Sequence, residues 1–325
     1  MASPSPTALR VEGVTKRYGS FVAVSTLSFD VPSGSIYGVL GPNGAGKTTT
    51  LRMINDILAP DEGEISILGD LRPGRIASRH IGYLPEERGL YPKMRVLELL
   101  QFFGELRGLR SARARERARA WLERLGIASW AKNRVQDLSK GMQQKVQFAA
   151  AIVHDPEILI LDEPWSVLDP INADVLREVV LEERGRGKTI VFSTHLMEQA
   201  EKLCDRVCII ARGERALEGE LSRLKREAAE DRLVALAFAD DDARARAETG
   251  PLADASLVSA VRERQDHIEV EVASESSSDA LLAALVGAGA GVRRFELIEP
   301  SLHQIFVDKV GAEAAADRSP AEASA

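Results

Sequence analysis

The segment at residues 41–49, G-P-N-G-A-G-K-T-T, constrains this chain more than any other feature. It fits G-x-x-x-x-G-K-[ST], the phosphate-binding loop, which requires a strand before it and a helix after it. Residues 35–40 are short and apolar, which predicts a buried strand. After the loop, Leu51, Ile54 and Leu58 recur at helical spacing. Because both neighbours are in place, the sequence predicts a nucleoside triphosphate site rather than an ordinary glycine-rich turn.

The residue types in this loop explain how it would bind phosphate. Gly41, Gly44 and Gly46 can adopt backbone angles that other residues avoid, so successive N–H groups can point at one anion. The positive end of the following helix dipole lies behind them. Lys47 would reach the β- and γ-phosphates, and the Thr48 hydroxyl would bind Mg²⁺. The candidate triphosphate ligands are Gly41, Pro42, Asn43, Gly44, Ala45, Gly46, Lys47, Thr48 and Thr49.

Length and composition narrow the class of protein. A chain of 325 residues suggests one large domain or two. With 42 basic and 49 acidic residues its net charge is −7, which disfavours nucleic acid as the main partner. No run approaches the roughly 20 apolar residues of a membrane-spanning helix. Cys204 and Cys208 are too few for a metal site, so we expect them to be buried and reduced, as in a cytoplasmic protein.

Both ends of the chain are expected to be disordered. Residues 1–8 are rich in Ser, Pro and Ala and lack the apolar core of a secretory signal. Residues 311–325 are rich in Ala, Glu, Ser and Asp, a composition that does not support a packed core.

Acidic residues follow a second apolar strand. Residues 158–161 read as a buried strand and lead directly into Asp162-Glu163-Pro164. In a parallel sheet the carboxyl ends of the strands carry the chemistry. Asp162 can hold Mg²⁺ through water. Glu163 points elsewhere, being one residue further on, and can polarise an attacking water. The pair is therefore predicted to be catalytic rather than plain surface charge.

Sequence spacing alone leaves two possible roles for each of two further residues, His195 and Tyr18. The predicted strand at residues 189–192 ends in Ser193-Thr194-His195, so His195 would lie on the same sheet edge as Asp162. It could contact the γ-phosphate or be an ordinary structural histidine. Tyr18 lies between predicted antiparallel strands at residues 9–14 and 23–31. Its ring could stack on a purine base or pack within a small sheet.

A helical region is predicted between these segments. Residues 96–109 and 112–125 both show helical periodicity, with Leu97, Leu100, Phe103 and Leu106 marking one face of the first helix. The second helix is rich in arginine, which we interpret as a solvated face rather than a nucleic-acid patch, because no aromatic residues are interleaved. Residues 138–145, L-S-K-G-M-Q-Q-K, begin a helix to about residue 154, with Ser139 placed as its cap.

A second unit is predicted to begin near residue 231. Its segments follow the order β-α-β-β-α-β-α, which is typical of a small ferredoxin-like sandwich. The run Asp240-Asp241-Asp242 could form a metal cluster, but a helix cap at a strand end is the favoured interpretation. No catalytic constellation is evident in this unit.

Taken together, these motifs resemble those of an ATP-binding cassette (ABC) ATPase, and the resemblance covers residues 9–225. In that family's terms residues 41–48 are Walker A, 158–163 are Walker B and 166–169 are the D-loop. His195 matches the switch histidine, and Tyr18 matches the aromatic that stacks on adenine. The signature motif comprises Ser139, Lys140, Gly141, Met142 and Gln143.

Three positions depart from the commonest family pattern. Glu86 stands where a Gln usually senses Mg²⁺ and the membrane partner. A carboxylate can still bind the cation, but it adds charge. Lys140 replaces a second Gly of the signature, and Val167 replaces the usual Gly of the D-loop. We expect the change at Val167 to be tolerated.

The resemblance also implies a fold and a domain plan. The fold is α/β, a P-loop NTPase of the ABC type with an antiparallel β subdomain and an inserted helical subdomain, followed by a small α+β ferredoxin-like domain. The expected boundaries are residues 1–8 for a disordered start, 9–225 for the ATPase domain with its helical subdomain at about 90–155, 231–310 for the accessory domain and 311–325 for a disordered tail.

Other stretches resemble one subgroup of the family. I-G-Y-L-P-E-E-R-G-L-Y, F-S-T-H-L-M-E-Q and P-S-L-H-Q-I-F are similar to bacterial exporter cassettes of the sodium-efflux and drug-resistance kind. The implied ligands are ATP and Mg²⁺, with Thr48, Asp162 and Glu86 around the metal and Glu163, His195 and Lys47 as catalytic residues. The implied partners are a second cassette, whose Ser139 and Gly141 cover the ATP, and a separately encoded membrane permease.

This resemblance implies a location at the cytoplasmic face of the membrane. The alternative is an ABC ATPase that acts on nucleic acid or ribosomes. Such proteins usually carry two cassettes in one chain or a long coiled-coil insertion. This chain shows one cassette and no heptad run, so transport is favoured and no nucleic-acid partner is expected.

Overall fold

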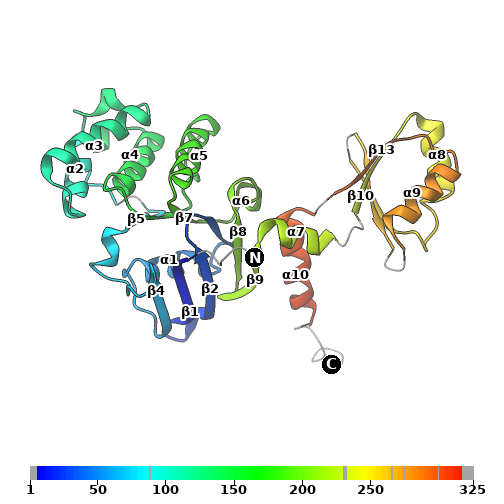
Figure 1. Ribbon diagram of the computed structural model, residues 1–325, viewed down its shortest axis with the longest axis horizontal. Helices are drawn as coiled ribbons and strands as arrows, with labels where there is room; N and C mark the ends of the chain where they lie inside the picture. Colours follow the sequence, from blue (N-terminus) through cyan, green and yellow to red (C-terminus); the bar gives the residue numbers. More distant parts are fainter. Residues whose placement is uncertain are drawn as a thin grey trace. The chain divides into compact units, whose positions relative to one another are not determined.

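The computed structural model describes residues 6–87, 89–229, 233–264, 266–273, 276–298 and 300–316. The chain forms two compact units that divide after Glu220 (Figure 1). The sequence placed the end of the first domain at residue 225. Residues 221–225 belong instead to the second unit, because α7 (Leu221–Ala229) packs against α10 (Leu302–Ala316).

A six-stranded sheet forms the centre of the first unit. Its strands are ordered β5-β6-β7-β3-β8-β9, and all neighbours are parallel except β8 and β9. They are β3 (Ile36–Leu40), β5 (Ile81–Leu84), β6 (Ile158–Asp162), β7 (Thr189–Thr194), β8 (Arg206–Ala211) and β9 (Glu214–Glu220). Every residue of β3, β6 and β7 is buried, as expected for parallel strands that are covered on both faces.

A three-stranded antiparallel sheet shares its core with one face of this sheet. It is ordered β2-β1-β4, from β1 (Thr7–Tyr18), β2 (Phe21–Pro32) and β4 (Glu62–Ile67). The ring of Phe29 stacks on that of Tyr37, with centroids 5.5 Å apart, and so joins β2 to β3. Helix α1 (Lys47–Ile54) contributes Leu51, Met53 and Ile54 to the same core. Glu64 of β4 pairs with Glu12 of β1.

Helices cover the other face of the central sheet (Figure 1). They include α2 (Val96–Leu106), α3 (Ser111–Arg124), α4 (Lys140–Ile152) and α5 (Pro170–Gly185), with the short α6 (Met197–Leu203) after β7. The apolar face predicted for α2 is only partly correct. The helix buries Val96, Leu99, Leu100 and Gly104, whereas Leu106 is 65% exposed. Both α3 and α4 pack on α2, and they contact a face displaced from the predicted one.

Most arginines of α3 are exposed, as predicted, whereas the side chain of Arg117 is only 16% exposed. Arg113 pairs with Glu116 on the same helix, Arg117 with Asp155 and Arg124 with Glu182. Pairing with nearby carboxylates lowers the positive charge that this face presents to an anionic partner.

The second unit is a ferredoxin-like sandwich. Its sheet is antiparallel throughout and ordered β11-β12-β10-β13, which is the order expected for β-α-β-β-α-β. The elements are β10 (Leu233–Phe238), α8 (Asp241–Thr249), β11 (Val258–Glu263), β12 (Ile268–Val272), α9 (Ser278–Gly287) and β13 (Val292–Leu297). Asp240 caps α8, because its Oδ1 accepts the Ala243 N–H at 2.7 Å.

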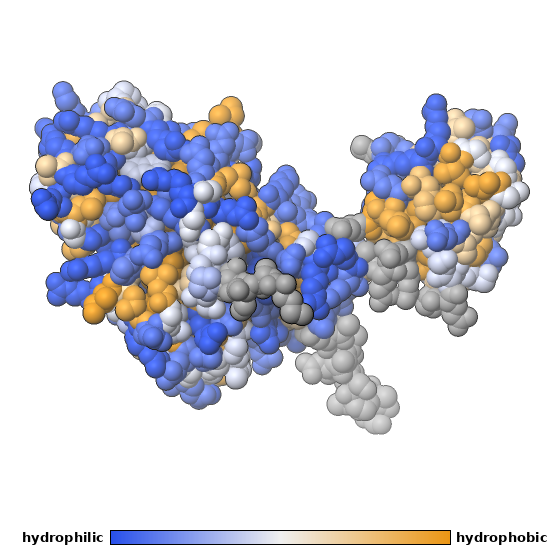
Figure 2. All heavy atoms as spheres, viewed as in Figure 1, coloured by the Kyte–Doolittle hydropathy of each residue, from blue (hydrophilic) through white to orange (hydrophobic). Residues whose placement is uncertain are grey.

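Apolar residues also reach the surface of this unit. Figure 2 shows them gathered where α9 lies in Figure 1. Leu281 and Leu285 of α9 are buried against the sheet, whereas Val286 is 68% exposed.

Parts of both ends that were predicted to be disordered belong to regular secondary structure. Thr7 and Ala8 already belong to β1. The Ala8 side chain is buried in the hydrophobic core, and its carbonyl oxygen accepts a hydrogen bond from the Leu68 N–H beside β4. Helix α10 continues through Ala316, so residues 311–316 are helical. The rest of both predicted tails, residues 1–5 and 317–325, lies outside the described residues.

Cys204 and Cys208 are both buried and unlinked, as predicted. Burial raises the pKa of each thiol well above its usual range, so neither is a ready thiolate. In the part of the chain that the structure describes, no helix is both long and apolar enough to cross a bilayer.

A buried histidine makes the stability of the first unit depend on pH. His154 is 8% exposed, and its Nε2 lies 3.1 Å from the Ile81 carbonyl oxygen. Burial, together with the charges of Arg107, Lys188 and Arg117, lowers the pKa of His154 to about 4. The unfolded chain therefore binds a proton below about pH 6.5 that the folded chain does not bind until about pH 4.

We expect this proton to destabilise the fold as the pH falls. Between about pH 7.5 and about pH 5, His154 should contribute a loss of about 2 kcal/mol in the free energy of unfolding. His154→Gln should show a correspondingly smaller loss when unfolding by denaturant is measured at both pH values. His303→Gln, at an exposed position of α10, is the control and should behave as wild type. Equal pH dependence in His154→Gln and wild type would contradict the assignment.

Candidate active site

The loop between β3 and α1 has the geometry that its motif predicts. Gly41 and Gly46 have φ values of 148° and 105°. A Cβ at Gly41 would lie 2.1 Å from the Ile210 carbonyl oxygen, and one at Gly46 would lie 2.6 Å from that of Ala23. Because backbone atoms stand at these distances, only glycine fits at either position.

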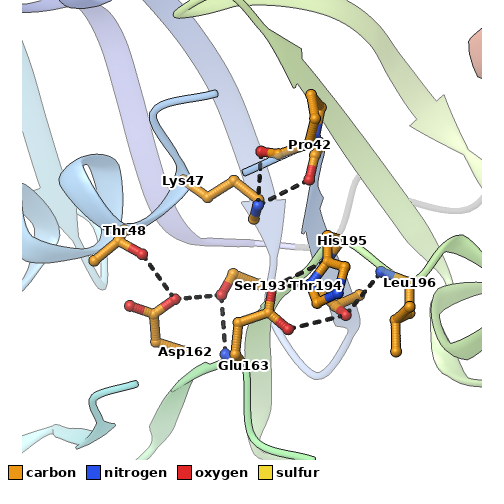
Figure 3. Close-up of polar contacts among 10 residues, drawn as sticks. Pro42, Lys47, Thr48, Asp162, Glu163, Ser193, Thr194, His195 and Leu196 are labelled. Atoms are coloured by element: carbon orange, nitrogen blue, oxygen red, sulfur yellow. Dashed lines mark hydrogen bonds and ion pairs between the residues drawn. The ribbon is translucent and has the colours of Figure 1, made fainter. Parts of the chain in front are cut away.

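Lys47 lies inside this loop. Its Nζ donates to the carbonyl oxygens of Gly41 at 2.8 Å and Pro42 at 3.0 Å (Figure 3). The residue is 6% exposed. Burial lowers its pKa, while the carboxylates of Glu163, Asp162 and Glu86 act in the opposite direction. The negative charges of these three acids therefore favour the protonated ammonium group.

Asp162 ends β6 with its side chain completely buried. Its Oδ1 accepts hydrogen bonds from Ser193 Oγ at 2.5 Å and Thr48 Oγ1 at 3.3 Å (Figure 3). Burial raises the pKa of Asp162, and the hydrogen bonds from Ser193 and Thr48 oppose that rise. Its Oδ2 is buried and has no hydrogen-bond partner among the described residues. A buried carboxylate oxygen without a donor, beside a threonine hydroxyl, fits a hard cation such as Mg²⁺.

Glu163 follows directly, with a different set of partners. Its Oε1 accepts the His195 backbone N–H at 3.0 Å and lies 2.8 Å from His195 Nδ1. Thr194 Oγ1 donates to Oε2 at 3.3 Å. The backbone adopts a φ of 47°, which is uncommon outside glycine, and its N–H donates to Ser193 Oγ at 3.1 Å. The turn therefore aims the two consecutive acids at different neighbours.

Ser193 and Thr194 were not singled out from the sequence. Ser193 bonds to Asp162 and also to the backbone of Glu163, and Thr194 bonds to the carboxylate of Glu163. The sequence did contain a feature that could have identified them, because both residues directly precede His195 at the end of the same strand. Hydroxyls are common in strands, however, and the motif names only the histidine.

The remaining predicted residues lie in three places. Tyr18 ends β1 with a ring that is 47% exposed, so it is not packed within the sheet. Glu86 follows β5 on an exposed segment, and its charge acts on both Lys47 and Asp162. The signature residues begin α4, where Ser139 Oγ accepts the Met142 N–H at 3.3 Å as the helix cap. Ser139 and Lys140 are exposed there.

Comparison with known proteins agrees with this geometry. Residues 24–166 match the family model described as ABC transporter, and residues 219–310 match that of the ATP-binding protein DrrA1-3-like, C-terminal domain. The chain is 43% identical over 305 residues to the uncharacterized ABC transporter ATP-binding protein YhaQ of Bacillus subtilis (strain 168), covering 94% of this chain and 99% of that protein.

This chain belongs to the ATP-binding subunits of ABC transporters. The linearmycin resistance ATP-binding protein LnrL of Bacillus subtilis (strain 168) is 32% identical over 306 residues, which cover 93% of this chain and 98% of LnrL. A dimeric structure of the cassette MJ0796 bound to ADP and Pi superposes with a TM-score of 0.61 at 25% identity, over 66% of this chain and 98% of that one.

Membership confirms the α/β ABC ATPase fold and the activity predicted from the sequence. The protein is an ATP-binding subunit of a transporter and a transport-coupled ATPase. Cassettes of this family dimerise and act with membrane permease subunits. The comparisons give no support to the alternative of an ATPase that acts on nucleic acid or ribosomes.

The position of Ser193 generates a prediction about turnover. Ser193→Ala removes the shorter of the two hydrogen bonds to the charged Asp162 Oδ1, and a hydrogen bond to a charged group contributes about 1.5–3 kcal/mol. We therefore expect kcat for ATP hydrolysis to fall by about tenfold to a hundredfold.

The matched control lies at the opposite end of the same strand. Thr189 Oγ1 accepts the Gly34 N–H at 3.0 Å, so Thr189→Val also loses a buried hydroxyl but should retain kcat. A wild-type kcat in Ser193→Ala would show that this hydroxyl does not support the acids.

Proposed function

We propose that this subunit drives export of a cargo through a separately encoded membrane permease. Among its relatives are LnrL and the Nod factor export ATP-binding protein I of Paraburkholderia xenovorans (strain LB400), whose names refer to resistance and export. The match to the DrrA1-3-like C-terminal domain extends the similarity beyond the cassette. Pairing with a permease would place the subunit at the cytoplasmic face of the membrane.

The loop and Tyr18 form the proposed ATP site. Residues 41–49 surround the phosphates with backbone N–H groups, and Lys47 exchanges its two carbonyl partners for phosphate oxygens. That exchange is favourable because a phosphate offers full negative charge where a carbonyl offers a dipole. Tyr18, half exposed at the end of β1, stacks on the adenine.

Thr48, Asp162 and Glu86 form the proposed Mg²⁺ site. The observation that supports it is the buried Oδ2 of Asp162 without a donor, next to the Thr48 hydroxyl. When bound, the ion neutralises charge on the β- and γ-phosphates. Ser193 keeps Asp162 Oδ1 occupied and so leaves Oδ2 free for the ion or its water.

Glu163 and His195 carry the proposed hydrolysis. Glu163 is 7% exposed and accepts the proton of the attacking water. The contact with His195 Nδ1 orients the imidazole, and its Nε2 would be available to hold the γ-phosphate. This pair is the single observation that carries the proposal of turnover rather than binding alone, because the proposed base and the proposed phosphate contact meet where the neighbouring strands β6 and β7 end.

A second cassette completes the proposed site. Its residues Ser139, Lys140, Gly141, Met142 and Gln143 would cover the ATP from the opposite side. Ser139 is exposed at the start of α4, so the positive end of that helix dipole is available to a γ-phosphate. The dimeric MJ0796 cassette, which holds ADP and Pi, supports this arrangement.

The assignment of the base is tested by Glu163→Gln. We expect ATP to bind normally and kcat to fall by at least about a hundredfold, since a positioned general base contributes about 10² to 10⁴. An ATP-dependent dimer should accumulate, which light scattering after size exclusion would detect. Glu178→Gln, at an exposed position of α5, is the control. Near wild-type hydrolysis in Glu163→Gln would rule out Glu163 as the base.

The stacking role is tested by Tyr18→Ala. Base stacking on an aromatic is worth about 1–3 kcal/mol, so ATP affinity should fall by about tenfold to a hundredfold while kcat is retained. Tyr91→Ala, which removes a tyrosine that is 52% exposed on the helical subdomain, should leave affinity unchanged. A defect in kcat alone would argue against stacking.

A further inference from the structure

Helix α4 carries two glutamines that are almost completely buried. Gln144 is 3% exposed and Gln147 is 4% exposed. They are three residues apart and therefore lie on one face of the helix. An amide that is removed from water is destabilising unless it is hydrogen-bonded, so the partners of these two side chains indicate why they are there.

Gln147 bonds to the chain on both sides of Glu86. Its Nε2 donates to the Pro85 carbonyl oxygen at 3.0 Å and to the Glu87 carbonyl oxygen at 3.0 Å. Both acceptors are carbonyls, so the NH₂ end of the amide must face them. One side chain thus fixes the carbonyls of residues i and i+2 and, with them, the backbone of the residue between.

Gln144 makes a similar bond to the other acidic segment. Its Nε2 donates to the Pro164 carbonyl oxygen at 3.1 Å, one residue after Glu163. The same helix face therefore contacts the segment that bears Glu86 and the segment that bears Glu163.

The oxygen of the Gln147 amide argues against a side chain that only fills space in the core. Its Oε1 is buried and has no hydrogen-bond partner among the described residues. Such an oxygen lowers stability, and an apolar residue of the same size would avoid it. What an apolar residue lacks is the pair of donors to Pro85 and Glu87.

We propose that Gln147 is a positioning residue that holds Glu86 toward the metal side of the nucleotide site, and that Gln144 and Gln147 connect the signature end of α4 to both acidic segments. The inference rests on the proposed function, which gives Glu86 its role toward Mg²⁺. A carboxylate at this position repels Asp162 unless a cation lies between them, so its placement has to be fixed.

The test is Gln147→Met, which keeps length and volume but removes both donors. In the full-length chain we expect the Mg²⁺ concentration for half-maximal ATPase activity to rise about tenfold. Activity at saturating Mg²⁺ should remain within about threefold of wild type, and ATP binding in EDTA should be unchanged. Gln147→Asn keeps the amide on a shorter stem; it should give an intermediate shift and serves if the Met variant does not fold.

Lys145→Met is the matched control on the same helix. Lys145 is 9% exposed, and its Nζ donates to the Leu125 carbonyl oxygen at 3.1 Å, away from both acidic segments. Like Gln147→Met it removes a buried donor, but it should not shift the Mg²⁺ dependence. If Gln147→Met and Lys145→Met have the same Mg²⁺ dependence, Gln147 is only a structural contact and the proposal is overturned.

A double-mutant cycle with Glu86→Gln separates this proposal from the one on which it rests. If Gln147 acts through Glu86, Glu86→Gln alone shifts the Mg²⁺ dependence, and adding Gln147→Met shifts it little further. Additive shifts overturn the proposal. A shift in Glu86→Gln but none in Gln147→Met overturns it and leaves the metal role of Glu86 intact. No Mg²⁺-dependent ATPase activity in wild type would overturn the proposed function itself.

Discussion

Parallel pairing of β3, β6 and β7 is the constraint on which the rest of this site depends. Leu40 pairs with Thr194 and Asp162 pairs with Ser193, so the three strands end in register. Their carboxyl ends bring the phosphate loop, the two acids and His195 to one edge of the sheet. A shift of register by one residue would turn Asp162 away from Ser193 and break the hydrogen bond between them.

At this edge of the sheet, burial and neighbouring groups act in opposite directions on the pKa values of the ionisable side chains. Lys47, Asp162 and Glu163 are all nearly inaccessible to water. Lys47 is retained as a cation among carboxylates, whereas burial pushes Asp162 toward protonation and two hydroxyls resist that push. Such a site interacts favourably with a ligand that carries both cationic and anionic groups, as ATP with Mg²⁺ does.

The helical subdomain is connected to this edge through its buried polar side chains. α4 begins at the exposed signature residues and contacts, further along, the backbone on both sides of Glu86 and the backbone after Glu163. Apolar packing would tolerate small sliding of the helix, but hydrogen bonds to three carbonyls are directional. Ligand contacts at the start of α4 are therefore able to act on both acidic segments.

The sequence by itself determined the conformation of the phosphate-binding loop, the position of Asp162-Glu163 at a strand end and both folds, because these are local patterns set by backbone geometry. It misjudged the end of the first domain and the buried face of α2, since both depend on which helix packs alongside. Only the tertiary structure decided that Ser193 bonds to Asp162, 31 residues away, and that Gln147 bonds to Pro85, 62 residues away. The physical reason is that hydroxyl and amide side chains carry no periodic signal, and their partners are chosen only when the strands pair and the helices pack.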